Sequence, residues 1–122
     1  MIDYLCPTCS ARHAVTLDRF RCDCGAPLDL DFESSPLDQE ALARRPATLW
    51  RYREALPLGE QLAPTSLGEG LTPVIDDVIG KTPVHLCLEY VAPTGSYKDR
   101  GASLLVAVAA SLGATDVVDD SS

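Results

Sequence analysis

The chain has 122 residues, of which 46% are apolar, and its formal net charge is −8. This composition is typical of a folded protein and excludes a disordered one. The excess of acidic residues argues against a basic surface for phosphate groups, so we expect no nucleic-acid partner. We also expect no membrane contact, because the longest apolar stretch, residues 102–114, contains Ser and Gly and is too short to cross a bilayer.

The N-terminal residues carry no sign of a secretory signal. The chain begins Met-Ile-Asp-Tyr-Leu-Cys, without a basic segment followed by an apolar one. We therefore expect a cytoplasmic protein, in which cysteines are thiols or metal ligands more often than disulfides.

Four of the five cysteines lie near the N-terminus as two closely spaced pairs. Two residues stand between Cys6 and Cys9, one residue stands between Cys22 and Cys24, and twelve residues separate the pairs. Two tight turns that each present two sulfurs supply the tetrahedral set that Zn²⁺ prefers. The spacing favours a closed, structural zinc site, whose metal would contribute on the order of 10 kcal/mol to folding. Two disulfides, or four reduced cysteines in an ordinary hairpin, are the alternatives.

The other candidate metal ligands stand outside this pattern. Cys87 lies in an apolar stretch, and we expect it to be an ordinary core residue. His13 and His85 have no partner pattern around them, so the sequence assigns neither a role.

Composition divides the chain into three segments: residues 1–32 with the clustered cysteines, residues 33–69 with four prolines, and residues 70–122. The middle segment has two short helical patterns, at residues 37–45 and 49–56. We interpret it as a connector that crosses the surface of the third segment, with Trp50 in the second pattern as its anchor.

The third segment has an α/β pattern. Residues 82–90 predict a strand, residues 97–112 a helix between Ser96 as N-cap and Gly113 as left-handed C′ residue, and residues 115–118 the start of another strand. This order predicts a right-handed parallel crossover. Because the helix is apolar nearly all round, it needs partners on several sides. The α/β domain is therefore expected to be incomplete in this chain.

Lys98 stands in the first turn of the predicted helix, where the helix dipole disfavours a cation. The same field, with partial burial, would favour the neutral amine that a Schiff-base nucleophile requires. The alternative is a solvated lysine that pairs with Asp99 or Glu89.

Residues 93–101, Pro-Thr-Gly-Ser-Tyr-Lys-Asp-Arg-Gly, closely resemble the segment of threonine synthases and related fold-type II pyridoxal-phosphate enzymes that contains the cofactor lysine. Residues 50–52 (Trp-Arg-Tyr) and 66–73 (Ser-Leu-Gly-Glu-Gly-Leu-Thr-Pro) are similar to two further signatures of that family, in the same order. The cysteine-rich segment resembles a zinc ribbon found in one branch of it. The resemblance implies short β hairpins that hold zinc, followed by the beginning of a fold-type II domain. It also implies that Lys98 is the catalytic, cofactor-binding lysine, with Tyr97 beside the cofactor.

For a complete homologue, the resemblance implies conversion of O-phospho-L-homoserine, an amino-acid substrate, to L-threonine and phosphate. The family's phosphate-binding loop would lie downstream, so we expect this chain to be inactive alone. Ala92 and Tyr97 depart from the family, which usually has Asn and more commonly Phe there. Residues 66–72 would lie near the entrance to the substrate-binding site, or they would form only a turn before a strand.

Two other functions stay open at this point. One is a related fold-type II enzyme, similar to threonine dehydratase or cysteate synthase, and the other is a stand-alone zinc-ribbon module that binds a protein. An exposed edge of an incomplete sheet would favour self-association, so a homo-oligomer is also an open alternative.

Overall fold

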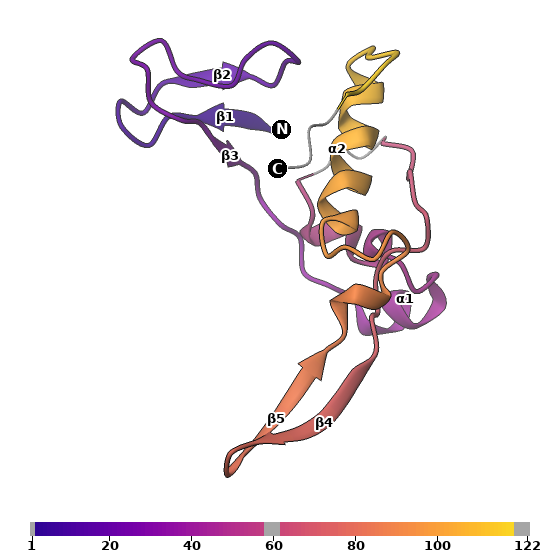
Figure 1. The fold of residues 1–122 in the computed structure, drawn as a ribbon. Helices are drawn as coiled ribbons and strands as arrows, with labels where there is room; N and C mark the ends of the chain where they lie inside the picture. Colours follow the sequence, from indigo (N-terminus) through magenta and orange to yellow (C-terminus); the bar gives the residue numbers. More distant parts are fainter. Residues whose placement is uncertain (1, 58–61, 119–122) are drawn as a thin grey trace.

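The computed structural model describes residues 2–57 and 62–118. They form a small N-terminal sheet, a connector with short helices, a hairpin and one longer helix (Figure 1). Within this described part, no helix has both the length and the apolar character needed to cross a membrane. The buried apolar side chains are Cys6 and Cys22 in the N-terminal part and Trp50, Ala92, Ala107 and Ala109 in the remainder.

The N-terminal sheet has three strands of three residues each: β1 (Asp3–Leu5), β2 (Arg12–Ala14) and β3 (Asp29–Asp31). β1 lies in the centre and pairs antiparallel with both neighbours, with Tyr4 opposite His13 on β2. Strands this short are only marginally stable by themselves. The sheet therefore depends on what the loops between its strands hold together.

The connector contains both predicted helices. α1 (Gln39–Arg44) begins after Asp38, whose carboxylate accepts a backbone N–H of the first turn at 3.0 Å and forms the N-cap. This cap explains why α1 starts two residues later than the pattern at residues 37–45 predicts. The second pattern, at residues 49–56, forms a 3₁₀ helix, η1 (Leu49–Ala55).

Trp50 anchors the connector on the longest helix among the described residues. Its side chain is 7% exposed. The indole N–H donates to Ser103 Oγ at 2.8 Å and to the carbonyl of Thr65 at 3.0 Å. Beside it, the backbone N–H of Leu49 donates to the carbonyl of Glu69 at 2.7 Å. The anchoring role predicted for Trp50 is thus present in the structure.

The hairpin of β4 (Val74–Ile79) and β5 (Thr82–Cys87) extends away from the helices (Figure 1). Six residue pairs form its antiparallel register, and Gly80, with φ of 68°, sits in the turn. The predicted strand at residues 82–90 is therefore present but shorter. It ends where η2 (Glu89–Val91), a short 3₁₀ helix, follows.

The expectation that Cys87 is a core residue is wrong. Cys87 is exposed at the end of β5, because the hairpin packs against no second layer within the described residues. Its thiol instead contacts the polar side chains of Thr72 and Glu89.

The helix predicted at residues 97–112 is α2 (Asp99–Ser111), and its end is as expected. Gly113 has φ of 89°, its N–H donates to the carbonyl of Ala110, and the N–H of Ala114 donates to the carbonyl of Ala109, both at 3.0 Å. These two bonds form a Schellman motif.

The parallel crossover expected around this helix is absent from the described residues. β5 pairs with β4 in an antiparallel hairpin, and residues 115–118 form no strand. The physical reason is local pairing: β5 finds its hydrogen-bond partner across a two-residue turn, and no described strand neighbours residues 115–118.

Candidate functional site

The two cysteine pairs meet in one cluster. All four sulfurs lie within 4.8 Å of one another, with Cys6 Sγ 3.6 Å from Cys24 Sγ and Cys9 Sγ 3.5 Å from Cys22 Sγ. Four sulfurs around Zn²⁺ at about 2.3 Å would lie roughly 3.8 Å apart, close to these separations. All four thiols are free, so the disulfide alternative is not realised. The cluster has the ligands and the size to hold a metal ion.

Two similar turns present the sulfurs. In the first, the N–H of Ser10 donates to the carbonyl of Cys6 at 2.9 Å, and in the second the N–H of Gly25 donates to the carbonyl of Cys22 at 2.8 Å. Ser10 and Gly25 both have positive φ, of 61° and 88°. Backbone N–H groups of Cys9 and of the preceding residue point at the Cys6 sulfur and lower the pKa of its thiol to about 6. The first turn therefore favours the thiolate form of Cys6.

The backbone N–H of Ala11 lowers the pKa of Cys9, but hydrogen bonds with the neighbouring sulfurs outweigh it and raise that pKa to about 12. At Cys22, the backbone N–H of Cys24 lowers the pKa, but burial and the neighbouring sulfurs of Cys24 and Cys6 together outweigh it and raise the pKa.

The sequence pattern did not predict that His13 lies beside the four-cysteine cluster. His13 Nε2 lies 3.4 Å from Cys22 Sγ. The available signal was weak, namely a histidine between the two cysteine pairs, and only the register of β1 and β2 brings the ring to the sulfur.

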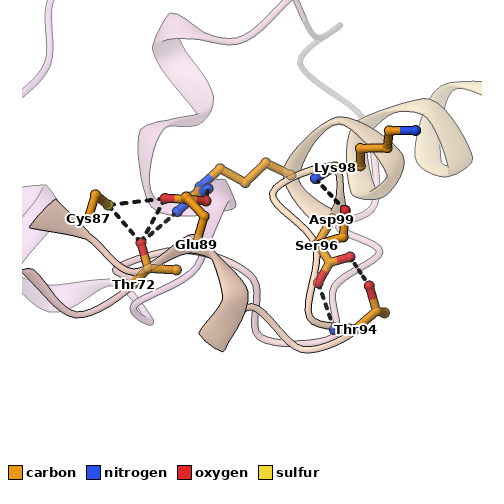
Figure 2. Close-up of polar contacts among 8 residues, drawn as sticks. Thr72, Cys87, Glu89, Thr94, Ser96, Lys98 and Asp99 are labelled. Carbon is orange, nitrogen blue, oxygen red and sulfur yellow. Dashed lines mark hydrogen bonds and ion pairs between the residues drawn. The ribbon is translucent and has the colours of Figure 1, made fainter.

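Lys98 stands at the N-terminal end of α2, as the N-cap residue itself. Its backbone N–H donates to Ser96 Oγ at 3.2 Å, while its side chain extends away from the other labelled residues (Figure 2). Within the described residues, the amine has no hydrogen bond or ion pair with Asp99 or Glu89. The partial burial expected for Lys98 is not observed, since the side chain is exposed. Tyr97 is 67% exposed beside it.

The turn before α2 is closed by Thr94 and Asp99. The Asp99 carboxylate accepts the backbone N–H of Thr94 at 2.8 Å and also the Thr94 hydroxyl (Figure 2). The prediction that Ser96 is the N-cap is wrong, because the N-cap residue of α2 is Lys98 and the Asp99 carboxylate bonds to Thr94. Because the N–H and the hydroxyl of Thr94 both bond to its carboxylate, Asp99 stabilises the turn formed by residues 94–98.

A second polar group joins α2 to the base of the hairpin. The Arg100 guanidinium pairs with the Glu89 carboxylate and donates to Thr72 Oγ1 at 3.1 Å. Thr72 and Cys87 in turn donate to Glu89 Oε1 at 2.9 and 3.0 Å (Figure 2). Arg100 above all, and then Cys87 and Thr72, lower the pKa of Glu89 to about 2. Glu89 is thus a carboxylate held by three donors.

A small pocket of about 140 Å³ lies between the residues after Pro64 and α2. Its lining includes Ser66, Leu67 and Glu69 on one side and Thr94 and Asp99 on the other. Neither Lys98 nor Tyr97 is part of the lining. Sites for cofactor-sized ligands usually measure about 300–1,000 Å³, so the pocket by itself accommodates only a small group.

Glu69 is the most deeply buried charged residue described in this region, at 1% exposure. Its Oε2 accepts the Ser66 hydroxyl at 2.9 Å and the N–H of Leu67 at 2.8 Å. Burial raises the pKa of Glu69, but the hydrogen bonds that it accepts outweigh burial and lower it. The loop at residues 66–69 is therefore wound around an ionised glutamate.

Proteins named threonine synthase are similar to this chain. That of Methanocaldococcus jannaschii is 32% identical over 117 residues, which cover 88% of this chain and 29% of that protein. That of Methanosarcina acetivorans is 31% identical over 120 residues, covering 92% and 29%. That of Mycobacterium tuberculosis is 41% identical over 66 residues, covering 50% and 18%.

No protein-family model matches this chain, and no solved structure matches it. The similarity to the two archaeal proteins extends over most of the chain, which spans less than a third of their length. The clustered cysteines fit a zinc ribbon. The chain is therefore a relative of the threonine synthases that carries a ribbon-like cysteine cluster at its N-terminal end.

Proposed function

We propose that this chain is the N-terminal part of a threonine synthase-like, pyridoxal-phosphate-dependent enzyme that converts O-phospho-L-homoserine to L-threonine and phosphate. The observation that carries the proposal is the similarity to proteins named threonine synthase over 88% and 92% of the chain. Because the chain spans 29% of those proteins, the reaction is proposed for a complete enzyme. The 122 residues alone are proposed to be inactive.

We assign Lys98 as the residue that holds the cofactor. Its amine is exposed and has no polar partner within the described residues, which fits covalent attachment of an aldehyde. Two braces, the Thr94–Asp99 pair and the Glu89–Arg100 pair, hold the backbone on either side of it. The cofactor supplies an electron sink when bound. Lys98 Nζ would then accept and return protons.

The four-cysteine cluster is proposed to hold a structural Zn²⁺. All four tetrahedral positions would be filled by sulfur, which leaves no open position for a substrate. We propose accordingly that residues 1–32 form the zinc ribbon, residues 33–69 the connector, and residues 70–122 the start of the cofactor-binding domain. Four free thiols suit a reducing compartment, and we propose a cytoplasmic location.

The assignment of Lys98 is tested by borohydride reduction of the purified chain with pyridoxal phosphate, followed by peptide mapping. The chain has two lysines, and Lys81, in the exposed hairpin turn, is the matched control. We expect the label on Lys98 in the natural chain and in Lys81→Ala. Equal labelling of the two lysines would contradict the assignment.

The reaction is tested in a chimera, in which this chain replaces the matching segment of the Methanocaldococcus jannaschii threonine synthase. We expect phosphate release from O-phospho-L-homoserine by the chimera and none by its Lys98→Ala variant. Absorbance of the bound cofactor serves as the folding control. A chimera that binds the cofactor but releases no phosphate would count against the proposed reaction.

A further inference from the structure

His13 lies against a cysteine that is itself buried. Cys22 is 5% exposed, and the Nε2 of His13 is 3.4 Å from its sulfur. The ring comes from β2, where His13 is opposite Tyr4 in the central strand of the sheet. The contact therefore joins the first hairpin to the second cysteine turn, across nine positions of the chain.

A sulfur-only metal site makes such a donor useful. Four thiolates carry four negative charges and Zn²⁺ neutralises two, so the sulfurs keep an excess of two. N–H groups that point at sulfur stabilise this excess, and a charged acceptor makes each hydrogen bond stronger than a neutral one. Cys6 receives its N–H groups from its own backbone turn. Cys22 likewise receives the backbone N–H of Cys24, and in addition the His13 side chain from β2 approaches its sulfur.

We propose that His13 donates from Nε2 to the Cys22 thiolate and thereby strengthens zinc binding by the four-cysteine cluster. The inference rests on the zinc site proposed above and adds a positioning residue outside the ligand set. His13 itself is not a ligand in this arrangement, because the four sulfurs already complete a tetrahedron. Loss of an outer-shell partner of this kind typically lowers metal affinity about 10–100-fold.

The test measures zinc affinity of the full chain by competition with a chromophoric chelator. His13→Leu removes the donor, and His13→Gln places an amide N–H near the position of Nε2. His85, which is exposed on β5 and bonded to Asp76 at 2.6 Å, provides the control His85→Leu. We expect a 10–100-fold loss for His13→Leu, recovery to within a few-fold of the natural chain for His13→Gln, and no change for His85→Leu.

An unchanged affinity in His13→Leu would overturn the inference. So would an equal loss in His13→Leu and His13→Gln, which would assign His13 a packing role. Absorption spectra of the Co²⁺-loaded chains provide a second readout, since His13→Leu should keep the bands of a four-thiolate site. A changed ligand set in that variant would instead make His13 a ligand. If the natural chain binds no zinc, the proposed zinc site itself is wrong. That outcome is distinguishable from a failure of the His13 proposal, because Cys24→Ser would then leave the zinc content unchanged.

Discussion

Arg100, two residues beyond Lys98, holds the carboxylate of Glu89, two residues beyond the end of β5. The pair ties the first turn of α2 to the base of the hairpin, and the Thr94–Asp99 pair closes the turn between them. The backbone of Lys98 is therefore fixed by two carboxylates, although its side chain is exposed.

The ion pair makes stability depend on pH in a defined window. The pKa of Glu89 is lowered from 4.5 to about 2, so the folded chain binds fewer protons than the unfolded chain over this range. The stabilising contribution is fully present above about pH 4.5 and is lost as the pH falls towards 2. Glu89→Gln should therefore unfold at lower denaturant concentration at pH 6 and show a smaller further loss between pH 5 and pH 3.

Urea titrations at several pH values measure this effect. Glu40→Gln is the control, because Glu40 forms an exposed pair with Arg44 within α1, and such pairs contribute little. Parallel pH profiles for the natural chain and Glu89→Gln would refute a role for this ion pair.

Metal removal should unfold the N-terminal segment. The three-residue strands of its sheet lack an apolar core beyond the buried cysteines, so zinc would contribute most of their stability. We expect Cys24→Ser to lower zinc content and to remove the protection of residues 3–31 from hydrogen exchange. Cys87→Ser, which alters the fifth cysteine, should leave both unchanged. Equal zinc content in the two variants would place the metal elsewhere.

Trp50→Phe should destabilise the junction between connector and α2. The change keeps an aromatic ring but removes the donor to Ser103 Oγ and to the Thr65 carbonyl, which lie at 2.8 and 3.0 Å. The buried Ser103 Oγ would lose its donor, at a cost of about 1–3 kcal/mol, while the Thr65 carbonyl keeps the Ser103 hydroxyl as its donor. Tyr90→Phe, at a residue that is 71% exposed, should change the free energy of unfolding by about 0.5 kcal/mol or less. A loss in Trp50→Phe no greater than in Tyr90→Phe would mean that the indole hydrogen bonds add no stability.

Local signals in the sequence predicted local structure well. The helix at α2 and its end at Gly113 follow from apolar residues and one glycine, and the proximity of the four cysteines follows from their spacing. These features depend on residues a few positions apart, or on ligand chemistry that leaves few arrangements.

Features that depend on pairing between distant residues were predicted less well. The strand at β5 was recognised, but its partner was not, because residues 74–79 (Val-Ile-Asp-Asp-Val-Ile) place two acids in the middle of an apolar run. The N-cap was predicted at Ser96, and the bond between Thr94 and Asp99 was not predicted, because it depends on how the turn folds. The contact of His13 with Cys22 requires the register of two strands, which the sequence pattern does not fix.

Gly70 is required by a close approach of two backbones. A Cβ at this position would lie 2.7 Å from the carbonyl carbon of Thr48 and 2.8 Å from the backbone nitrogen of Leu49, and φ is 138°. Gly70→Ala should therefore separate the loop at residues 66–69 from the start of η1 and destabilise the chain by about 1–3 kcal/mol.

Gly101 is the matched control, because it lies inside α2 and a Cβ there would meet nothing within 4 Å. Gly101→Ala should stabilise the chain by about 0.5–1 kcal/mol through the higher helix propensity of alanine. Thermal unfolding of both variants with zinc present gives the comparison. Gly70→Ala should lower the midpoint temperature of unfolding, and Gly101→Ala should raise it. A shift in the same direction for both substitutions would show that the contact between Gly70 and residues 48–49 is not tight in solution.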